Sequence, residues 1–405
     1  MRILIVTQYF WPENFRINDL VDGLLDRGHQ VVILTGKPNY PDGKVFADFV
    51  NNPAKFNRYK AAKVIRIPMI ARGGSKLSLL MNYFSFTLNA SLLGPWKLRG
   101  HKFDIVFAYQ ASPITVGIPA IILSSIKRAP LALWILDLWP DTLEALGYVR
   151  SKMLLRLMGK LSSIIYSRCD LILSQSKGFI SKIRQYAGDG PSIKYFPGWA
   201  EVIFKTFDVT PAKEIHEKQG TFNVMFAGNI GKAQDFPAIL DAAELLKDSP
   251  NIRWLIVGSG RKKNWVAKQI NRRGLQSNVL LLGQFPLKRM PSFFLQADAL
   301  LVSLCNQPLF SMTIPGKIQS YLTTGKPILA MLNGEGADLI HKGRAGLVCS
   351  SGDYKSLAKN VLKLSQMPLK NRQLMGARGI KLFNAEFNRD YLIPWLEILL
   401  KSLKS

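Results

Sequence analysis

The sequence predicts two α/β domains, in each of which helices cover both faces of a parallel sheet. Short apolar runs recur along both halves of the chain, and within each run the apolar residues are continuous rather than alternating. Continuous runs are typical of strands buried on both faces. Helical patterns lie between the runs, and strands that alternate with helices build doubly wound, Rossmann-like domains. A length of 405 residues is enough for two such domains.

The strands are expected in one set for each half of the chain. The first set is residues 2–7, 30–35, 63–68, 104–109, 131–136 and 171–176. The second set is residues 223–228, 253–260, 278–283, 299–304, 327–332 and 345–350, with helices between them, for example over 233–248, 261–273 and 354–366.

A weakly periodic stretch between the two sets predicts the domain boundaries. Residues 199–220 contain Pro, Gly and Lys and are expected to form a linker. We therefore expect a first domain over residues 1–198, a second over 221–384, and a helix over 385–405 that returns to the first domain. Ligands of such sheets lie at the carboxyl ends of the strands, so we expect the two domains to face a ligand-binding cleft.

The charge and the cysteines restrict the partners and the setting. Lys and Arg number 54 against 27 Asp and Glu, which gives a net charge of +27. Such a surface suits nucleic acid, an anionic membrane or a phosphorylated substrate. The three cysteines, Cys169, Cys305 and Cys349, are far apart and form neither a disulfide framework nor a CxxC metal pair. A reducing, cytoplasmic setting is the simpler interpretation.

Two glycine turns directly after strands in the second half are candidate phosphate sites. The first turn spans residues 228–232 and the second 258–262, and each carries a Lys or Arg. Backbone N–H groups at the start of a helix bind anions, and an adjacent cation adds charge for a phosphate. The alternative is that both are merely tight turns.

Lys317 follows Pro315 and Gly316 at the start of a predicted helix. A cation there is unfavourable unless an anion lies beside it, which makes Lys317 a third candidate. The alternative is a solvated surface lysine.

Acidic residues after strands of the first half are candidate catalytic groups. Glu13 follows the first strand, where no G-x-G-x-x-G occurs, and this argues against a nicotinamide-dependent dehydrogenase. Asp137 lies at the carboxyl end of the strand over 131–136, where it either caps the next helix or faces the cleft. No Asp-x-Asp pair occurs and the four His residues are scattered, so we expect no metal site.

An acid-free window between Asp48 and Asp104 predicts peripheral membrane contact. It contains ten Lys and Arg residues beside aliphatic and aromatic ones, and residues 150–168 repeat this composition. The alternative is that the apolar residues pack into the core. The residues expected to contact the membrane are Arg72, Lys76, Leu80, Tyr83, Phe84, Trp96, Lys97, Arg99, Arg156 and Lys160.

The uncharged stretch over residues 105–126 is long enough to be considered as a membrane span. Pro113, Gly117 and Pro119 interrupt it, so strand, loop and helix is the better prediction.

Together these motifs resemble a retaining glycosyltransferase of family four, over essentially the whole chain. IVTQYFWPEN resembles the family's first strand and loop, and DLWPD resembles a segment of its bacterial polysaccharide enzymes. AGNIGKAQD, VGSG, LLGQFP and IPGKIQSYLTTGKP resemble successive donor-binding segments. Within the family, QYFWPEN and AGNIGKAQ are most similar to transferases of N-acetyl-L-fucosamine in O-antigen and capsule synthesis.

The resemblance implies the GT-B fold and metal-independent transfer from UDP-L-FucNAc to undecaprenyl-diphosphate-GlcNAc. The enzyme would act as a peripheral protein at the cytoplasmic face of a bacterial inner membrane. It implies Asp137, Glu13 and Lys232 as catalytic residues and Trp11, Pro12, Asn14, Arg16 and Trp139 as acceptor contacts. The implied donor contacts are Gly228, Asn229, Gly231, Gln234, Gly258, Gly260, Arg261, Gly283, Phe285, Gly316, Lys317, Gln319 and Ser320.

The chain departs from the family pattern at several positions. Asn229 and Gln234 replace an Arg and a Lys, and Met312 and Ser320 replace a pair of glutamates. Leu136 replaces a His. Without the glutamates, both retention and inversion at the anomeric carbon stay open.

Two other functions are compatible with parts of the sequence. A UDP-sugar epimerase of the same fold would need no lipid-facing surface. A non-enzymatic nucleic-acid-binding protein would use the charge directly but would leave the phosphate turns without a role.

Overall fold

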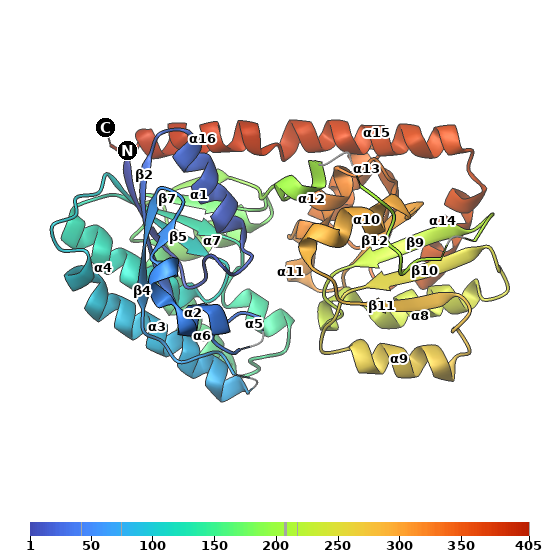
Figure 1. Ribbon diagram of the computed structural model, residues 1–405, viewed down its shortest axis with the longest axis horizontal. Coiled ribbons are helices and arrows are strands. Elements are labelled where there is room, and N and C mark those ends of the chain that lie inside the picture. Colours follow the sequence, from blue (N-terminus) through green and yellow to red (C-terminus); the bar gives the residue numbers. More distant parts are fainter. Residues whose placement is uncertain (42, 74, 206–208, 217, 405) are drawn as a thin grey trace. The chain divides into compact units, whose positions relative to one another are not determined.

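The computed structural model describes residues 1–405 except 42, 74, 206–208, 217 and 405. It divides into two compact units (Figure 1). Unit 1 is Met1–Phe196 together with Asp390–Ser405, and unit 2 is Pro197–Arg389.

Unit 1 contains, in its described residues, an eight-stranded sheet of order β3-β4-β2-β1-β5-β6-β7-β8. All neighbouring strands are parallel except β3 and β4. Ile3 to Val6 of β1 are fully buried, as expected of a strand covered on both faces. The strands are β1 (Arg2–Val6), β2 (Gln30–Gly36), β3 (Arg58–Tyr59), β4 (Ala62–Ile67), β5 (Ile105–Gln110), β6 (Leu131–Ile135), β7 (Leu171–Ser174) and β8 (Ser192–Tyr195).

The helices of unit 1 include one from the far end of the chain. They are α1 (Arg16–Asp26), α2 (Ala47–Asn51), α3 (Lys76–Lys97), α4 (Gly117–Lys127), α5 (Asp141–Ala145), α6 (Lys152–Tyr166), α7 (Phe179–Ala187) and α16 (Arg389–Lys401). Glu397 of α16 forms ion pairs with Arg27, which follows α1, and with Lys401. α16 also buries Leu396 and Leu400.

Unit 2 contains a parallel sheet of six described strands in the order β11-β10-β9-β12-β13-β14. Neighbouring residues of β9, Val224 and Met225, point into two different cores, so both faces are covered. The strands are β9 (Phe222–Ala227), β10 (Ile252–Val257), β11 (Val279–Gly283), β12 (Ala299–Ser303), β13 (Ile328–Met331) and β14 (Gly346–Cys349). The helices are α8 (Phe236–Leu245), α9 (Lys263–Arg272), α10 (Met290–Leu295), α11 (Pro308–Ser311), α12 (Gly316–Leu322), α13 (Glu335–Lys342), α14 (Tyr354–Gln366) and α15 (Leu369–Glu386).

The predicted fold class is confirmed, because every predicted strand region contains a strand and both α/β sheets are parallel apart from the β3–β4 pair. The cleft between the two domains stays a prediction. Residues 199–220, predicted as a linker, contribute Ala212 and Ile215 to a core of unit 2. Within this segment, residues 206–208 and 217 lie outside the described residues.

Residues 105–126 form β5, a turn and the greater part of α4, as the sequence predicts. Within the described chain, no helix combines the length and the apolar character that crossing a membrane requires.

Candidate functional site

The predicted donor residues meet at the carboxyl edge of the sheet in unit 2. The turn after β9 begins at Gly228, the turn after β10 begins at Gly258, and β11 ends at Gly283. The Gly228 N–H donates to the Val257 carbonyl (2.8 Å), and the Gly258 N–H donates to the Gly283 carbonyl (2.7 Å). The structure therefore brings three of the predicted segments side by side.

Two of these turns require glycine. Gly228 and Gly258 have φ of +135° and +140°, which side-chain-bearing residues rarely adopt. A Cβ at Gly258 would collide with the Gly228 carbonyl oxygen, and a Cβ at Gly228 would lie 2.6 Å from Cε of Lys317. The glycines thus let two turns and a lysine pack against one another.

Lys317 is the cation of this edge. It lies in the first turn of α12, and its Nζ is 3.4 Å from the centroid of the Phe226 ring. The nitrogen is buried and has no hydrogen-bond partner among the described residues. Burial lowers the pKa of Lys317 to about 7. Because an unpaired buried ammonium is unfavourable, this arrangement favours an anion beside it.

The other predicted cations of unit 2 lie at the surface. Lys232 and Arg261 are exposed, and neither forms an ion pair within the described part of the chain. Gln234 supports the first turn, because its Oε1 accepts the N–H of Gly231 (3.1 Å). Asn229 lies between the turns, with its Oδ1 close to the position that a Cβ on Gly260 would take.

A carboxylate that the sequence did not suggest lies beside α12. Ser320 donates to Oε2 of Glu201 (3.4 Å), so a carboxylate is present at the position where the family's second glutamate is missing. With the Gln319 amide turned so that its nitrogen faces acceptors, it donates to the carbonyls of Pro315 (3.1 Å) and Gly316 (2.9 Å) and holds the start of the helix. The partners Ser320 and Glu201 are 119 residues apart, so no local pattern reveals them.

Phe285, after β11, packs against the ring of Phe293 of α10 with centroids 4.6 Å apart. The guanidinium of Arg289 lies 5.2 Å from the Phe285 centroid. This predicted donor contact is therefore held in a small aromatic cluster.

In unit 1, Glu13 binds backbone groups of two loops. Its Oε1 accepts the N–H groups of Asn39 and Tyr40 (both 2.8 Å), and its Oε2 accepts the N–H of Phe10 (3.2 Å). Burial raises the pKa of Glu13 to about 7, although these three hydrogen bonds and Arg66 lower it. Both oxygens are engaged, so the geometry indicates a positioning residue rather than the predicted catalytic one.

Arg66 holds the loop that contains Trp11 and Glu13. In the sequence, Arg66 stands out only as one of the cations of the acid-free window. It donates to the carbonyls of Gly36 (2.9 Å) and Trp11. The sequence feature that could have revealed this role is the position of Arg66 inside the apolar run over 63–68.

Two further predicted acceptor residues lie near Trp11 in the chain. Pro12 follows Trp11 and is half-buried, and Asn14 is exposed. Arg16 has a buried Nε without a partner among the described residues.

Asp137 differs from Glu13, because no backbone N–H group of the described residues donates to its carboxylate. It follows β6, and its carboxylate forms no hydrogen bond or ion pair with any described residue. Burial raises the pKa of Asp137 to about 7. An unpaired carboxylate that titrates near neutrality is suited to accept a proton, so Asp137 is the better candidate for a general base.

Other unsatisfied polar atoms lie at the same sheet edge. Gln8 and Gln110, at the ends of the neighbouring strands β1 and β5, each have a buried Oε1 without a donor among the described residues. Trp139 has a buried Nε1 without a described partner, and its ring meets Tyr83 of α3 at 6.4 Å. Buried polar atoms are normally paired, so these groups favour a polar ligand.

The residues predicted to contact a membrane divide into two groups. Arg72 and Tyr83 lie at this site and are only partly exposed. Leu80, Phe84 and Trp96 are exposed on α3, and Lys97 and Arg99 flank the Trp96 ring.

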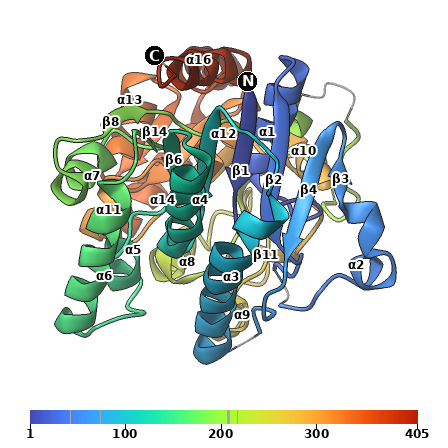
Figure 2. The same cartoon turned by 90° about the vertical axis from the view of Figure 1, so that its left-hand side faces the viewer.

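Arg156 and Lys160 are exposed on α6, while the side chain of Lys76 lies outside the described part of the structure. Figure 2 shows α3 and α6 on the same side of unit 1, where α4 contacts both.

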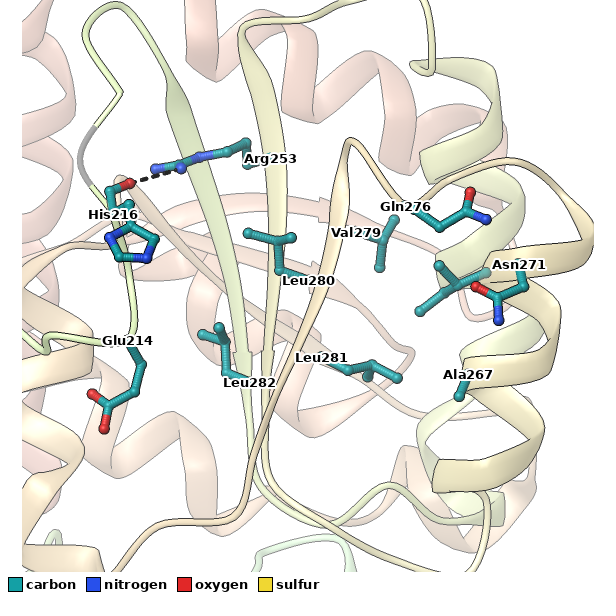
Figure 3. Close-up of a pocket in the computed structure, with 11 residues that line it drawn as sticks. Glu214, His216, Arg253, Ala267, Asn271, Gln276, Val279, Leu280, Leu281 and Leu282 are labelled. Carbon is teal, nitrogen blue, oxygen red and sulfur yellow. Dashed lines mark hydrogen bonds between the residues drawn. The ribbon is translucent and has the colours of Figure 1, made fainter.

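A pocket of about 420 Å³ lies beside β11, the edge strand of unit 2 (Figure 3). Glu214, His216 and Arg253 border one end of it, and Asn271 and other residues of α9 border the opposite end. None of the predicted donor residues lines this pocket, so it is separate from the strand-end turns.

Part of unit 2 matches a family model, and two known proteins match larger parts of the chain. Residues 221–367 match the family model of glycosyl transferases group 1. The chain is 25% identical over 267 residues to the probable glycosyltransferase WbjE of Pseudomonas aeruginosa. This match covers 62% of this chain and 65% of WbjE, so the chain spans slightly less than two thirds of the length of WbjE. It is 24% identical over 351 residues to the putative colanic acid biosynthesis glycosyl transferase WcaI of Escherichia coli K12, which covers 80% of this chain and 82% of WcaI.

Solved structures share the whole fold. Sucrose-phosphate synthase of Thermosynechococcus elongatus has a TM-score of 0.74 at 13% identity and covers 99% of this chain and 98% of its own. Anabaena HepE in complex with UDP-glucose has a TM-score of 0.70 at 15% identity and covers 99% of this chain and 100% of its own. Residues 221–367 thus match a glycosyl transferases group 1 domain, and the chain as a whole shares the GT-B fold.

Proposed function

We propose that the protein transfers a sugar from a UDP-linked donor, bound at the strand-end turns of unit 2, to a lipid-diphosphate-linked sugar. The buried, unpaired Lys317 beside the Gly228 turn carries this proposal, because it is suited to the diphosphate of a nucleotide sugar. Complexes of HepE with UDP and UDP-glucose support a donor of this class. The name of WcaI supports a role in surface polysaccharide synthesis. The more specific form is transfer of N-acetyl-L-fucosamine from UDP-L-FucNAc to undecaprenyl-diphosphate-GlcNAc in O-antigen synthesis.

We propose the following roles for the candidate groups in this reaction. The acceptor hydroxyl oxygen bonds to the anomeric carbon, the bond from that carbon to the diphosphate oxygen breaks, and the hydroxyl proton passes to Asp137. Lys317 and the turn N–H groups stabilise the negative charge that develops on UDP. We also propose that transfer needs no metal, so EDTA is expected to leave turnover unchanged.

Ligand-dependent melting and UDP release test the proposal. UDP is expected to raise the melting temperature, whereas GDP, ADP and a short DNA are not, and UDP release is expected only with a lipid-diphosphate-GlcNAc acceptor. Lys317→Met should abolish the UDP shift, and Lys342→Met on the exposed end of α13 should not. Epimerisation of the UDP-sugar without acceptor, or stabilisation by DNA alone, would contradict the proposal.

We further propose that α3 and α6 hold the enzyme at the cytoplasmic face of an anionic membrane. Leu80 and Phe84 of α3 are 61% and 59% exposed, and Leu157 of α6 is 62% exposed. Arg156 and Lys160 are exposed on the same helix as Leu157, and basic residues near anionic lipid contribute about 1 kcal/mol each. Apolar side chains flanked by cations suit an interfacial helix.

Flotation with liposomes tests this contact. The protein is expected to float with anionic vesicles at low salt and to float less at high salt. Leu80→Glu with Phe84→Glu should abolish flotation, whereas Leu374→Glu, an exposed leucine of α15, should not. Absence of lipid association at both salt concentrations would contradict the proposal.

A further inference from the structure

Arg72 is a fixed cation without a counter-charge. Its backbone N–H donates to Oδ1 of Asn39 (3.0 Å), and its guanidinium lies 5.1 Å from the centroid of the Tyr40 ring. The guanidinium forms no hydrogen bond or ion pair with the residues that the structure describes. No acidic residue occurs in its own stretch of chain between Asp48 and Asp104. The loop thus holds the cation in place and leaves it free to bind a ligand.

Tyr83 connects this cation to the candidate base. Burial raises the pKa of Tyr83, a hydrogen bond from Ser112 and the charge of Arg72 lower it, and the charge of Asp137 raises it. The Tyr83 hydroxyl is therefore close enough to both charges to be affected by each. Two contacts place Tyr83 near both segments: its ring lies 6.4 Å from the ring of Trp139, two residues after Asp137, and its neighbour Asn82 donates to the carbonyl of Ile70, two residues before Arg72.

The exposed stripe of α3 begins beside the same tyrosine. Leu80 precedes Tyr83 by one turn and Phe84 follows it directly, and both are exposed. Asn82, between them, accepts from Gln8 (2.7 Å) and donates to the Ile70 carbonyl (2.6 Å), which fixes the helix to the site. An apolar surface therefore leads from solvent to a place with one cation and one carboxylate.

We infer that Arg72 binds a phosphate group of an amphiphilic acceptor, whose apolar chain lies along α3 and whose reacting hydroxyl lies at Asp137. The inference rests on the proposed function, since it specifies the acceptor of that reaction. A guanidinium matches phosphate with paired N–H donors, and the stripe of α3 suits a hydrocarbon chain rather than a free sugar phosphate.

Binding of farnesyl diphosphate, measured by calorimetry with saturating UDP present so that the donor site is filled, tests the inference. Wild-type protein is expected to bind farnesyl diphosphate at least about tenfold more tightly than either farnesol or inorganic pyrophosphate. Arg72→Met should weaken farnesyl diphosphate binding by about 10- to 100-fold and leave farnesol binding unchanged, and Arg72→Lys should restore part of the loss. The control is Arg58→Met, because Arg58 is exposed on β3.

Equal affinity of wild type and Arg72→Met for farnesyl diphosphate would overturn the inference. Pyrophosphate that binds as tightly as the lipid would also overturn it, because the site would then recognise free phosphate. An equal loss with Arg72→Met and Arg58→Met would show a general charge effect and overturn it too. If binding behaves as expected but no UDP-sugar reacts with any lipid acceptor, the proposed function fails and the anion site stands.

Discussion

Two carboxylates of unit 1 have the same raised pKa, about 7, but opposite surroundings. Glu13 accepts three backbone N–H groups from two loops. Asp137 has no hydrogen-bond partner among the described residues, and it precedes Trp139, whose ring meets Tyr83, by two residues. At the scale of single residues, the partners rather than the pKa separate a positioning group from a candidate base.

Asp137→Asn should lower kcat by about 100-fold or more, because a general base contributes roughly that factor. A base must be deprotonated, so the kcat/KM of the wild type should rise with pH through about 7, where Asp137 titrates. The variant should lose this rise and keep the wild-type affinity for UDP. A variant with wild-type kcat at pH 8 would exclude Asp137 as the base.

Glu13→Gln should destabilise the fold and leave the chemistry of the folded enzyme unchanged. The amide nitrogen of Gln cannot accept the backbone N–H groups that Glu13 satisfies, and each unsatisfied buried donor costs about 1–3 kcal/mol. Thermal melting measures the loss, and kcat per folded molecule is the control. A kcat that falls by 100-fold with an unchanged melting temperature would restore Glu13 as a catalytic group.

At the scale of elements, α12 and the segment before β9 build one side of the donor edge. The carboxylate of Glu201 accepts a hydrogen bond from Ser320 of α12. A carboxylate at this place can also accept hydrogen bonds from the hydroxyl groups of a sugar or a ribose. Glu201→Gln should therefore raise the KM for the UDP-sugar about tenfold with little change in kcat. Glu214→Gln, on the border of the separate pocket at β11, is the matched control. An unchanged KM would show that Glu201 only holds α12.

An acidic side chain of the C-terminal helix α16 contributes to its packing in unit 1, beside the buried leucines of the helix. Glu397 forms ion pairs with Arg27 and Lys401, and these two residues lower its pKa. A carboxylate whose pKa is lower in the folded protein than in the unfolded chain stabilises the fold at pH values above its ordinary pKa, and this stabilisation is lost as the pH falls. Glu397→Gln should therefore lower the stability more at pH 7 than at pH 4. Melting temperatures at both pH values measure this, and an equal loss at both would contradict the ion-pair explanation.

At the scale of the whole molecule, the sequence predicts more of the fold than of the site. Continuous apolar runs reveal each buried parallel strand, whereas β8, whose residues are exposed or half-buried, has no such run and is missed. Glycine turns after strands reveal the donor edge, because their signal is local. The contacts that define roles are not local: Glu13 meets Asn39 26 residues later, and Ser320 meets Glu201 119 residues earlier. A pattern read along the chain cannot show such pairs.

The two candidate ligand edges belong to different units, which predicts separate responses to two ligands. UDP should slow amide hydrogen exchange at residues 228–234, 258–263 and 316–322, because ligand binding stabilises the segments it contacts. Farnesyl diphosphate should slow exchange at residues 70–84 and 136–140 instead. Mass spectrometry of exchanged peptides from the whole chain measures both, and peptides from β7 and β14 provide the controls. Protection by UDP in unit 1 alone would place the nucleotide at the wrong edge and contradict the assignment of Lys317.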